Sequence, residues 1–91
     1  MIESFIHKGL RELYNDGKSS RIQPLLVGRI VRRLDAIDSA ALLYDLNVPG
    51  FNFHGLEGKP KRYSIHVNGP WRITFEWFEG GARFINLENY H

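Results

Sequence analysis

The sequence predicts an α+β fold, in which helices from the first half of the chain pack on one face of a small, mostly antiparallel sheet. Apolar residues recur at helical spacing in the first half. From residue 63 onward, apolar and polar residues alternate with the period of two that half-buried strands require. Glycine-containing turns near Gly69 and Gly80 divide this second half into two consecutive hairpins.

Three helices are predicted, preceded by an edge strand over the apolar run Met1 to Ile6. The first helix covers residues 7–16 and ends at Gly17, a residue type that takes the left-handed conformation at helix ends. Pro24 suits the first turn of the second helix, and the third helix is short, over residues 40–46. The second helix has an apolar stripe formed by Val27, Ile30, Val31, Leu34 and Ile37.

Register in the first hairpin follows from the rule that residues directly opposite each other share a face. A two-residue loop at Asn68 and Gly69 would place Arg72 opposite Ile65, among apolar residues. A loop of five residues centred on Gly69 segregates the side chains instead. Its apolar pairs are Val67 with Trp71, Ile65 with Ile73 and Tyr63 with Phe75, and its polar pairs are Ser64 with Thr74 and His66 with Arg72.

The second turn, Glu79 to Gly81, continues this segregation when it is centred on Gly80. It pairs Phe75 with Ile85, Ile73 with Leu87, Thr74 with Asn86 and Arg72 with Glu88, and it leaves Phe84 opposite Glu76 as one mismatch. One sheet face is therefore apolar and places Trp71 and Trp77 in the core. The other is an open polar face that carries Ser64, His66, Arg72, Thr74, Asn86, Glu88 and Tyr90.

The bulk composition predicts a single small domain over residues 1–91. Twelve Lys and Arg against ten Asp and Glu give a net charge of only +2, so charge alone identifies no polyanionic partner. The absence of cysteine excludes disulfides and thiolate metal sites. We see no signal-like or long apolar segment, so we expect a soluble, cytoplasmic protein without membrane contact.

Basic residues gather in two places. Lys59, Lys61 and Arg62 follow a short strand predicted around residues 52–54 and lie close to Arg72. The second group, formed by Arg29, Arg32 and Arg33, is predicted on the face of the second helix opposite its apolar stripe. A solvated helix face explains this second group best, and contact with RNA or an acidic protein surface is the alternative.

Several residues of the polar face have the chemistry needed to cleave RNA through its own 2′-hydroxyl. The histidines His54, His66 and His91 titrate near neutrality, as a proton-transfer group must. Arg72 offers a planar fork of donors that matches phosphate oxygens, and Tyr90 can donate a proton or stack on a base. This reaction requires no metal and no cofactor, although Glu57 and Glu88 leave a metal site as an alternative.

Three segments resemble the HigB toxins of the RelE superfamily. They are the opening Met1-Ile2-Glu3-Ser4-Phe5, the segment Asn68-Gly69-Pro70-Trp71-Arg72-Ile73-Thr74-Phe75 and the ending Asn89-Tyr90-His91. The resemblance implies a RelE-like fold and a ribosome-dependent mRNA endoribonuclease, an mRNA interferase, neutralised by a HigA-type antitoxin with a helix-turn-helix domain. It also implies that the active-site histidine is His54, the arginine Arg72, and the C-terminal pair Tyr90 and His91.

The chain departs from the family pattern at one position. Where the family often has His-Pro-Leu-Lys-Gly, this chain reads His54-Gly55-Leu56-Glu57-Gly58, so Glu57 occupies the place of the active-site lysine. Either Lys59 or Lys61 then supplies the missing cation. The predicted RNA-binding residues are Lys59, Lys61, Arg62 and His66, and the alternative role for His66 is support of Arg72.

Two other functions fit the same polar face. One is a binding module for RNA or the ribosome that performs no chemistry. The other is a toxin of the same fold that blocks a different target, such as a topoisomerase, by contact alone.

Overall fold

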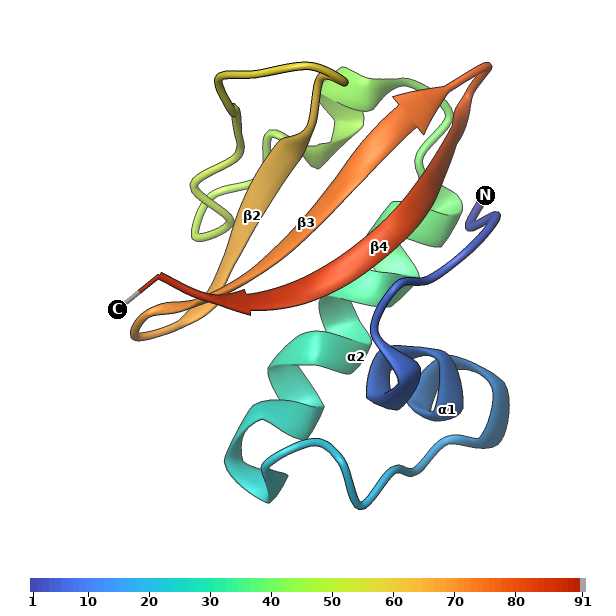
Figure 1. Ribbon diagram of the computed structural model, residues 1–91, viewed down its shortest axis with the longest axis vertical. Helices are drawn as coiled ribbons and strands as arrows, with labels where there is room; N and C mark the ends of the chain where they lie inside the picture. The colour runs from blue at the N-terminus through green and yellow to red at the C-terminus, as the bar shows by residue number, and fades with distance from the viewer. Residues whose placement is uncertain (91) are drawn as a thin grey trace.

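The computed structural model describes residues 1–90, and within them it has two α-helices, one short 3-10 helix and a four-stranded antiparallel sheet (Figure 1). The elements are α1 (Lys8–Asp16), α2 (Pro24–Ser39), η1 (Leu43–Leu46), β1 (His54–Gly55), β2 (Tyr63–Asn68), β3 (Trp71–Phe78) and β4 (Gly81–Asn89). The strands lie in the order β1-β2-β3-β4. This architecture confirms the predicted α+β class.

Both predicted long helices form, and each has the predicted terminal residue. The Nδ1 atom of His7 accepts a hydrogen bond from the Leu10 N–H at 3.2 Å and caps the start of α1. Gly17, with φ 79°, ends α1 in the left-handed conformation. Pro24 is the first residue of α2.

The predicted short third helix, over residues 40–46, is confirmed only in part, as the 3-10 helix η1 over its last four residues. Before η1, Asp45 Oδ2 accepts hydrogen bonds from the N–H groups of Ala41 at 3.0 Å and Leu42 at 2.9 Å.

In the first hairpin the predicted polar pairs, Ser64 with Thr74 and His66 with Arg72, are confirmed, as are Tyr63 with Phe75 and Ile65 with Ile73. The predicted pairing of Val67 with Trp71 is wrong. Asn68 lies opposite Trp71, so Val67 is the extra residue of a β-bulge, and the loop is only Gly69 and Pro70, with Gly69 at φ 56°. The bulge preserves the predicted register upstream although the loop is shorter than predicted.

The second hairpin also differs from the prediction at its turn. Glu79 (φ 50°) and Gly80 (φ 80°) form a two-residue loop with positive φ at both positions, the geometry of a type I′ turn. A second bulge then places Phe84 and Ile85 together opposite Phe75. Arg83, not Phe84, lies opposite Glu76, so the one predicted mismatch does not occur. Beyond the bulge three predicted pairs are confirmed, namely Ile73 with Leu87, Thr74 with Asn86 and Arg72 with Glu88.

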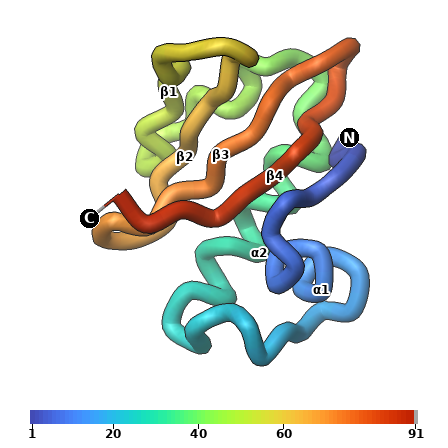
Figure 2. Tube along the Cα trace, in the orientation of Figure 1, coloured from blue at the N-terminus to red at the C-terminus, as the bar shows by residue number. Residues whose placement is uncertain are grey.

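The N-terminal segment runs parallel to β4 as an edge of the sheet but makes only two isolated bridges, Ile2 to Ala82 and Phe5 to Ile85 (Figure 2). The predicted strand over residues 1–6 is therefore not continuous. The bulge at Phe84 interrupts it, because the Phe84 N–H donates to the Ser4 hydroxyl at 2.9 Å instead of joining a regular ladder.

The core lies between the helices and the apolar face of the sheet, and α2 passes behind β3 and β4 in Figure 1. Trp71 and Trp77 are half-buried and pack against this core, as predicted. Val31 is not part of it, because its side chain points toward solvent. The fully buried side chains include Leu10, Ile30, Leu34, Ile37, Ile65, Ile73 and Phe75.

Arg33 corrects the prediction that all three arginines of α2 lie on its solvated face. Only 6% of Arg33 is exposed. Its Nε donates to the His66 carbonyl at 2.7 Å, and its Cζ lies 4.8 Å from the centroid of the Phe51 ring. Burial, followed by the nearby charges of Arg29 and Arg32, lowers the pKa of the guanidinium. Arg29 and Arg32 are exposed as predicted.

The polar face of the sheet is less open than predicted. Ser64 and Thr74 are fully buried and Glu76 is nearly so, because the side chains of Arg62 and Arg72 lie against them. In place of the strand predicted around residues 52–54, β1 begins two residues later and ends one residue later. Within residues 1–90, neither helix is long and apolar enough to cross a membrane.

Candidate active site

Arg72 is the centre of the polar groups that the sequence predicts as a site. It lies on β3 between His66 of β2 and Glu88 of β4, and its side chain is half-buried. Its Nε donates to the Ser64 hydroxyl, and its Nη2 donates to the Asn52 carbonyl at 3.1 Å. Its Nη1 has no protein acceptor within residues 1–90. Two protein acceptors therefore fix the plane of the guanidinium, and one nitrogen remains available for a ligand.

His54 begins β1 directly opposite Ser64, and this pairing brings the imidazole beside Arg72. Its Nδ1 lies 3.0 Å from the Asn52 carbonyl and 3.4 Å from Arg72 Nη2. A carbonyl only accepts, so the shorter contact requires a proton on Nδ1. A ring that carries its only proton on Nδ1 has a free lone pair on Nε2, as a general base needs, and His54 is exposed. Asn52 itself has φ 46°, which turns its carbonyl toward both side chains.

Tyr90 reaches the same place from the end of β4. Its N–H donates to the Pro70 carbonyl at 2.8 Å, which fixes the chain end beside the β2–β3 turn, as Figure 1 shows. Arg72 Cζ then lies 5.9 Å from the centroid of the tyrosine ring. Partial burial and the charge of Glu88 raise the pKa of the Tyr90 phenol, while Arg72 and Arg62 oppose this. The phenol is therefore protonated at neutral pH. The predicted fourth member, His91, lies outside the described residues.

Arg62, predicted as an RNA-binding residue, is engaged by the protein. Its Nη2 donates to Thr74 Oγ1 at 3.1 Å and to the Phe84 carbonyl at 2.8 Å, and its Nη1 lies 3.7 Å from the Glu76 carboxylate. Thr74 Oγ1 in turn donates to Glu88 at 2.5 Å. These contacts join the residue before β2 to β3 and β4 and give Arg62 a structural role.

The other predicted RNA-binding residues surround the candidate active site without joining it. His66 Nε2 lies 3.0 Å from the Gly69 carbonyl, so its ring is directed to the β2–β3 turn. Lys61 Nζ donates to the Leu56 carbonyl at 3.0 Å and lies 5.9 Å from the centroid of the Tyr63 ring. Lys59 and Glu57 are exposed in the loop between β1 and β2.

Comparison with known proteins identifies the family of this chain. The profile of the HigB-like toxins, described as RelE-like toxins of the type II toxin–antitoxin system HigB, matches residues 3–91. This chain belongs to that family. It is 44% identical over the full length of both chains to a protein of Proteus vulgaris named "Endoribonuclease HigB". It is 36% identical to "Toxin HigB-1" of Vibrio cholerae serotype O1, over 90% of each chain.

Membership in the family confirms the resemblance seen in the sequence. This chain is therefore the toxin of a type II toxin–antitoxin system, which has an antitoxin as its partner. Glu57, which departs from the family pattern, lies in the exposed loop between β1 and β2. The basic residues nearest to it in sequence are Lys59 and Lys61.

The sequence predicted Arg72, His54 and Tyr90, which lie close together in the structure, but not the groups that orient them. The Asn52 carbonyl leaves no signal in a sequence, because every residue has one. Ser64 did leave a signal, since the predicted register places it on the same face as Arg72 and a serine there offers an acceptor to a neighbouring guanidinium.

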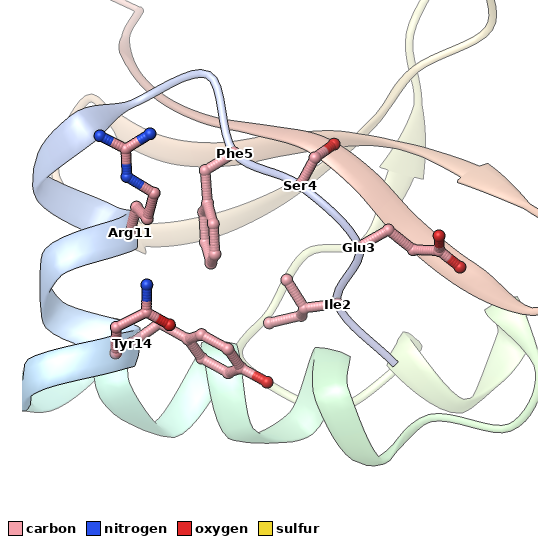
Figure 3. A pocket seen from close by; sticks show the side chains of 7 residues that line it. Ile2, Glu3, Ser4, Phe5, Arg11 and Tyr14 are labelled. Carbon is pink, nitrogen blue, oxygen red and sulfur yellow. The ribbon is translucent and has the colours of Figure 1, made fainter.

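A cavity of about 440 Å³ lies elsewhere, between the N-terminal segment and α1 (Figure 3). Ile2, Phe5 and Tyr14 project into it, and the rings of Phe5 and Tyr14 lie 5.5 Å apart between centroids. None of the candidate catalytic residues lines it. Its remaining walls are formed by Glu3, Ser4, Arg11 and Asn15.

Proposed function

We propose that this toxin is an endoribonuclease that cuts messenger RNA on the ribosome, and that His54, Arg72, Tyr90 and His91 form its active site. The observation that carries the proposal is the held guanidinium of Arg72, 3.4 Å from the His54 ring nitrogen and 5.9 Å from the Tyr90 ring centroid. The name of the Proteus vulgaris relative, which matches over the full chain, supports the same activity.

The chemistry uses the substrate's own 2′-hydroxyl as the nucleophile. His54 Nε2 takes the proton of that hydroxyl, and the oxygen attacks the adjacent phosphorus. Arg72 Nη1 stabilises the negative charge that develops on the phosphoryl oxygens. As the bond from phosphorus to the 5′-oxygen breaks, Tyr90 or His91 donates a proton to the leaving oxygen. The products are a 2′,3′-cyclic phosphate and a free 5′-hydroxyl.

A second cation is supplied by the loop between β1 and β2. Because Arg62 is engaged by Thr74, Phe84 and Glu76, the available cations there are Lys59 and Lys61. Among residues 1–90, Lys61 makes one hydrogen bond to a carbonyl and one cation–π contact, both of which it can exchange for a phosphate. His66 supports the β2–β3 turn beside Arg72 and adds positive potential when it is protonated.

The partner of the toxin is a HigA-type antitoxin, and the ribosome presents the message. Bound to the ribosome, the message would be held with its 2′-hydroxyl in line with the leaving oxygen.

The test compares His54→Ala and Arg72→Ala with Arg32→Ala, a matched control in which an exposed arginine of α2 is removed. The 5′ ends of message are mapped after a pulse of expression. We expect the two site variants to lower cleavage by roughly 100-fold to 10,000-fold and the control to cleave normally.

Binding to ribosomes is measured in parallel. If cleavage persists in both site variants, the assignment of the active site is wrong. If the wild type arrests growth without cutting message, the activity itself is wrong, and a non-catalytic binding module or action on another target, such as a topoisomerase, replaces it.

A further inference from the structure

Two phenylalanines surround Arg83 at the end of β3 farthest from Arg72. Arg83 Cζ lies 4.2 Å from the centroid of the Phe78 ring and 5.3 Å from that of the Phe84 ring. Both rings are open to solvent, with 48% of Phe78 and 43% of Phe84 exposed. We call Phe78, Arg83 and Phe84 the hairpin-tip cluster. Exposed aromatic rings beside a guanidinium are the arrangement on which unpaired bases stack.

The hairpin-tip cluster lies on the same sheet face as the candidate active site. Arg83 is directly opposite Glu76, and its Nε lies 3.3 Å from the Glu76 carboxylate. Along β3, Glu76 and Phe78 alternate in phase with Arg72, so their side chains project from one face. Arg62 lies between Arg72 and the hairpin-tip cluster, where it contacts Glu76. The face is therefore continuous from Arg72 to Phe78.

Phe84 occupies its position at a conformational cost. Its φ of 53° lies in the left-handed region, where a residue with a large side chain is strained and where Asn or Gly fits more easily. Its ring gains no burial in the core in return. An aromatic residue on a strained bulge, with its ring exposed beside a cation, points to a ligand for the ring.

We infer that the hairpin-tip cluster is a second substrate subsite, which stacks an unpaired base of the RNA strand whose scissile phosphate lies at Arg72. This inference rests on the proposed function. Six steps of roughly 3.3 Å along β3 separate Arg72 from Phe78, a span of about 20 Å. A single strand of a few nucleotides covers that span, which matches the smallest single-strand sites, of about four nucleotides.

The experiment measures binding of two 2′-O-methyl RNAs, which the proposed chemistry cannot cleave, by fluorescence anisotropy at low salt. The dinucleotide reaches only the candidate active site, while the octanucleotide reaches both sites. Phe84→Asn removes the ring and fits the positive φ, so the variant keeps its fold. We expect it to weaken octanucleotide binding by roughly 5-fold to 150-fold and to leave dinucleotide binding unchanged. Phe78→Ala should behave in the same way.

The matched control is Tyr44→Ala, which removes another exposed aromatic side chain, with 74% of its surface open, from η1. It should change neither affinity. Octanucleotide affinity that is unchanged in both phenylalanine variants overturns the second subsite and leaves the active-site proposal standing. Arg72→Ala, by contrast, should weaken both RNAs. If Arg72→Ala changes neither affinity while Phe84→Asn still weakens the octanucleotide, the active-site proposal fails and the stacking surface stands.

A second arm separates the substrate strand from ribosomal RNA as the source of the base. Affinity for ribosomes without message is compared between the wild type and Phe84→Asn. An unchanged affinity there, with loss of octanucleotide binding, supports contact with the substrate strand. Loss confined to empty ribosomes overturns it.

Discussion

Replacing Arg33 with Met tests whether a buried arginine without an acidic partner holds α2 against the sheet. The change removes the bond from Nε to the His66 carbonyl at 2.7 Å and the bond from Nη1 to the Arg29 carbonyl at 3.1 Å. It also removes the contact with the Phe51 ring at 4.8 Å. Phe51 and His66 are themselves joined, because the Phe51 carbonyl accepts from the His66 N–H at 2.6 Å. Both residues lose their contact with Arg33 in the variant.

The size of the effect follows from these contacts. A hydrogen bond from a charged donor contributes about 1.5 to 3 kcal/mol, and a desolvated cation–π contact about 1 to 2 kcal/mol. The cost of burying the charge, the same cost that lowers the pKa of Arg33, offsets part of that gain. We expect a net loss of about 2 kcal/mol in the free energy of unfolding. For a domain of this length that lowers Tm by roughly 8 to 16 °C.

Urea and thermal unfolding, followed by circular dichroism, measure the loss. Arg32→Met is the control on the same helix, because Arg32 is exposed and its replacement should change stability by less than about 0.5 kcal/mol. Arg33→Lys keeps the charge without the planar fork and should lose most of the same stability. If Arg33→Met is as stable as the wild type or more stable, the desolvation cost dominates and the reasoning is wrong.

Three further predictions concern single residues. Burial and then the charge of Arg21 lower the pKa of His7 below 6.5, so the unfolded chain binds a proton first and stability falls as the pH drops through that value. Melts at about pH 7 and about pH 5 should show a smaller difference for His7→Asn, and an equal difference would contradict the cap. Glu79→Asn should raise Tm by roughly 4 to 8 °C, because Asn-Gly suits a type I′ turn, and an unchanged melt would argue against that turn. Glu57→Lys should speed message cleavage by roughly 10-fold, since it adds a cation near the phosphate, and a slower rate would exclude a need for one there.

The alternating pattern predicted the sheet because one of its faces packs on the apolar core and the other is polar. His66 opposite Arg72 and Ile65 opposite Ile73 could be paired from sequence alone, since a shift of one residue would bury a charge. The helix ends at Gly17 and Pro24 were equally accessible, because these two residue types have few conformations to choose from.

Arg33 and Arg62 show what the pattern could not predict. Both are basic, and periodicity assigns a basic residue to solvent unless an acidic partner is near in sequence. The hydrogen-bond acceptors of the Arg33 guanidinium are backbone carbonyls, including that of His66 on β2. The acceptors of the Arg62 guanidinium lie on β3 and β4. Such partners become visible only when distant segments are brought together.

Three departures from regular structure occur at the two proposed sites, which are the active site at Arg72 and the hairpin-tip cluster. The bulge at Val67 lies beside the pair of His66 and Arg72, and the positive φ of Asn52 turns its carbonyl toward Arg72 and His54. The bulge at Phe84 exposes the ring of the hairpin-tip cluster. A bulge changes the direction of a side chain without changing the register beyond it. The regular alternation therefore builds the sheet, while three local irregularities, each costly by itself, position the groups that would meet an RNA strand.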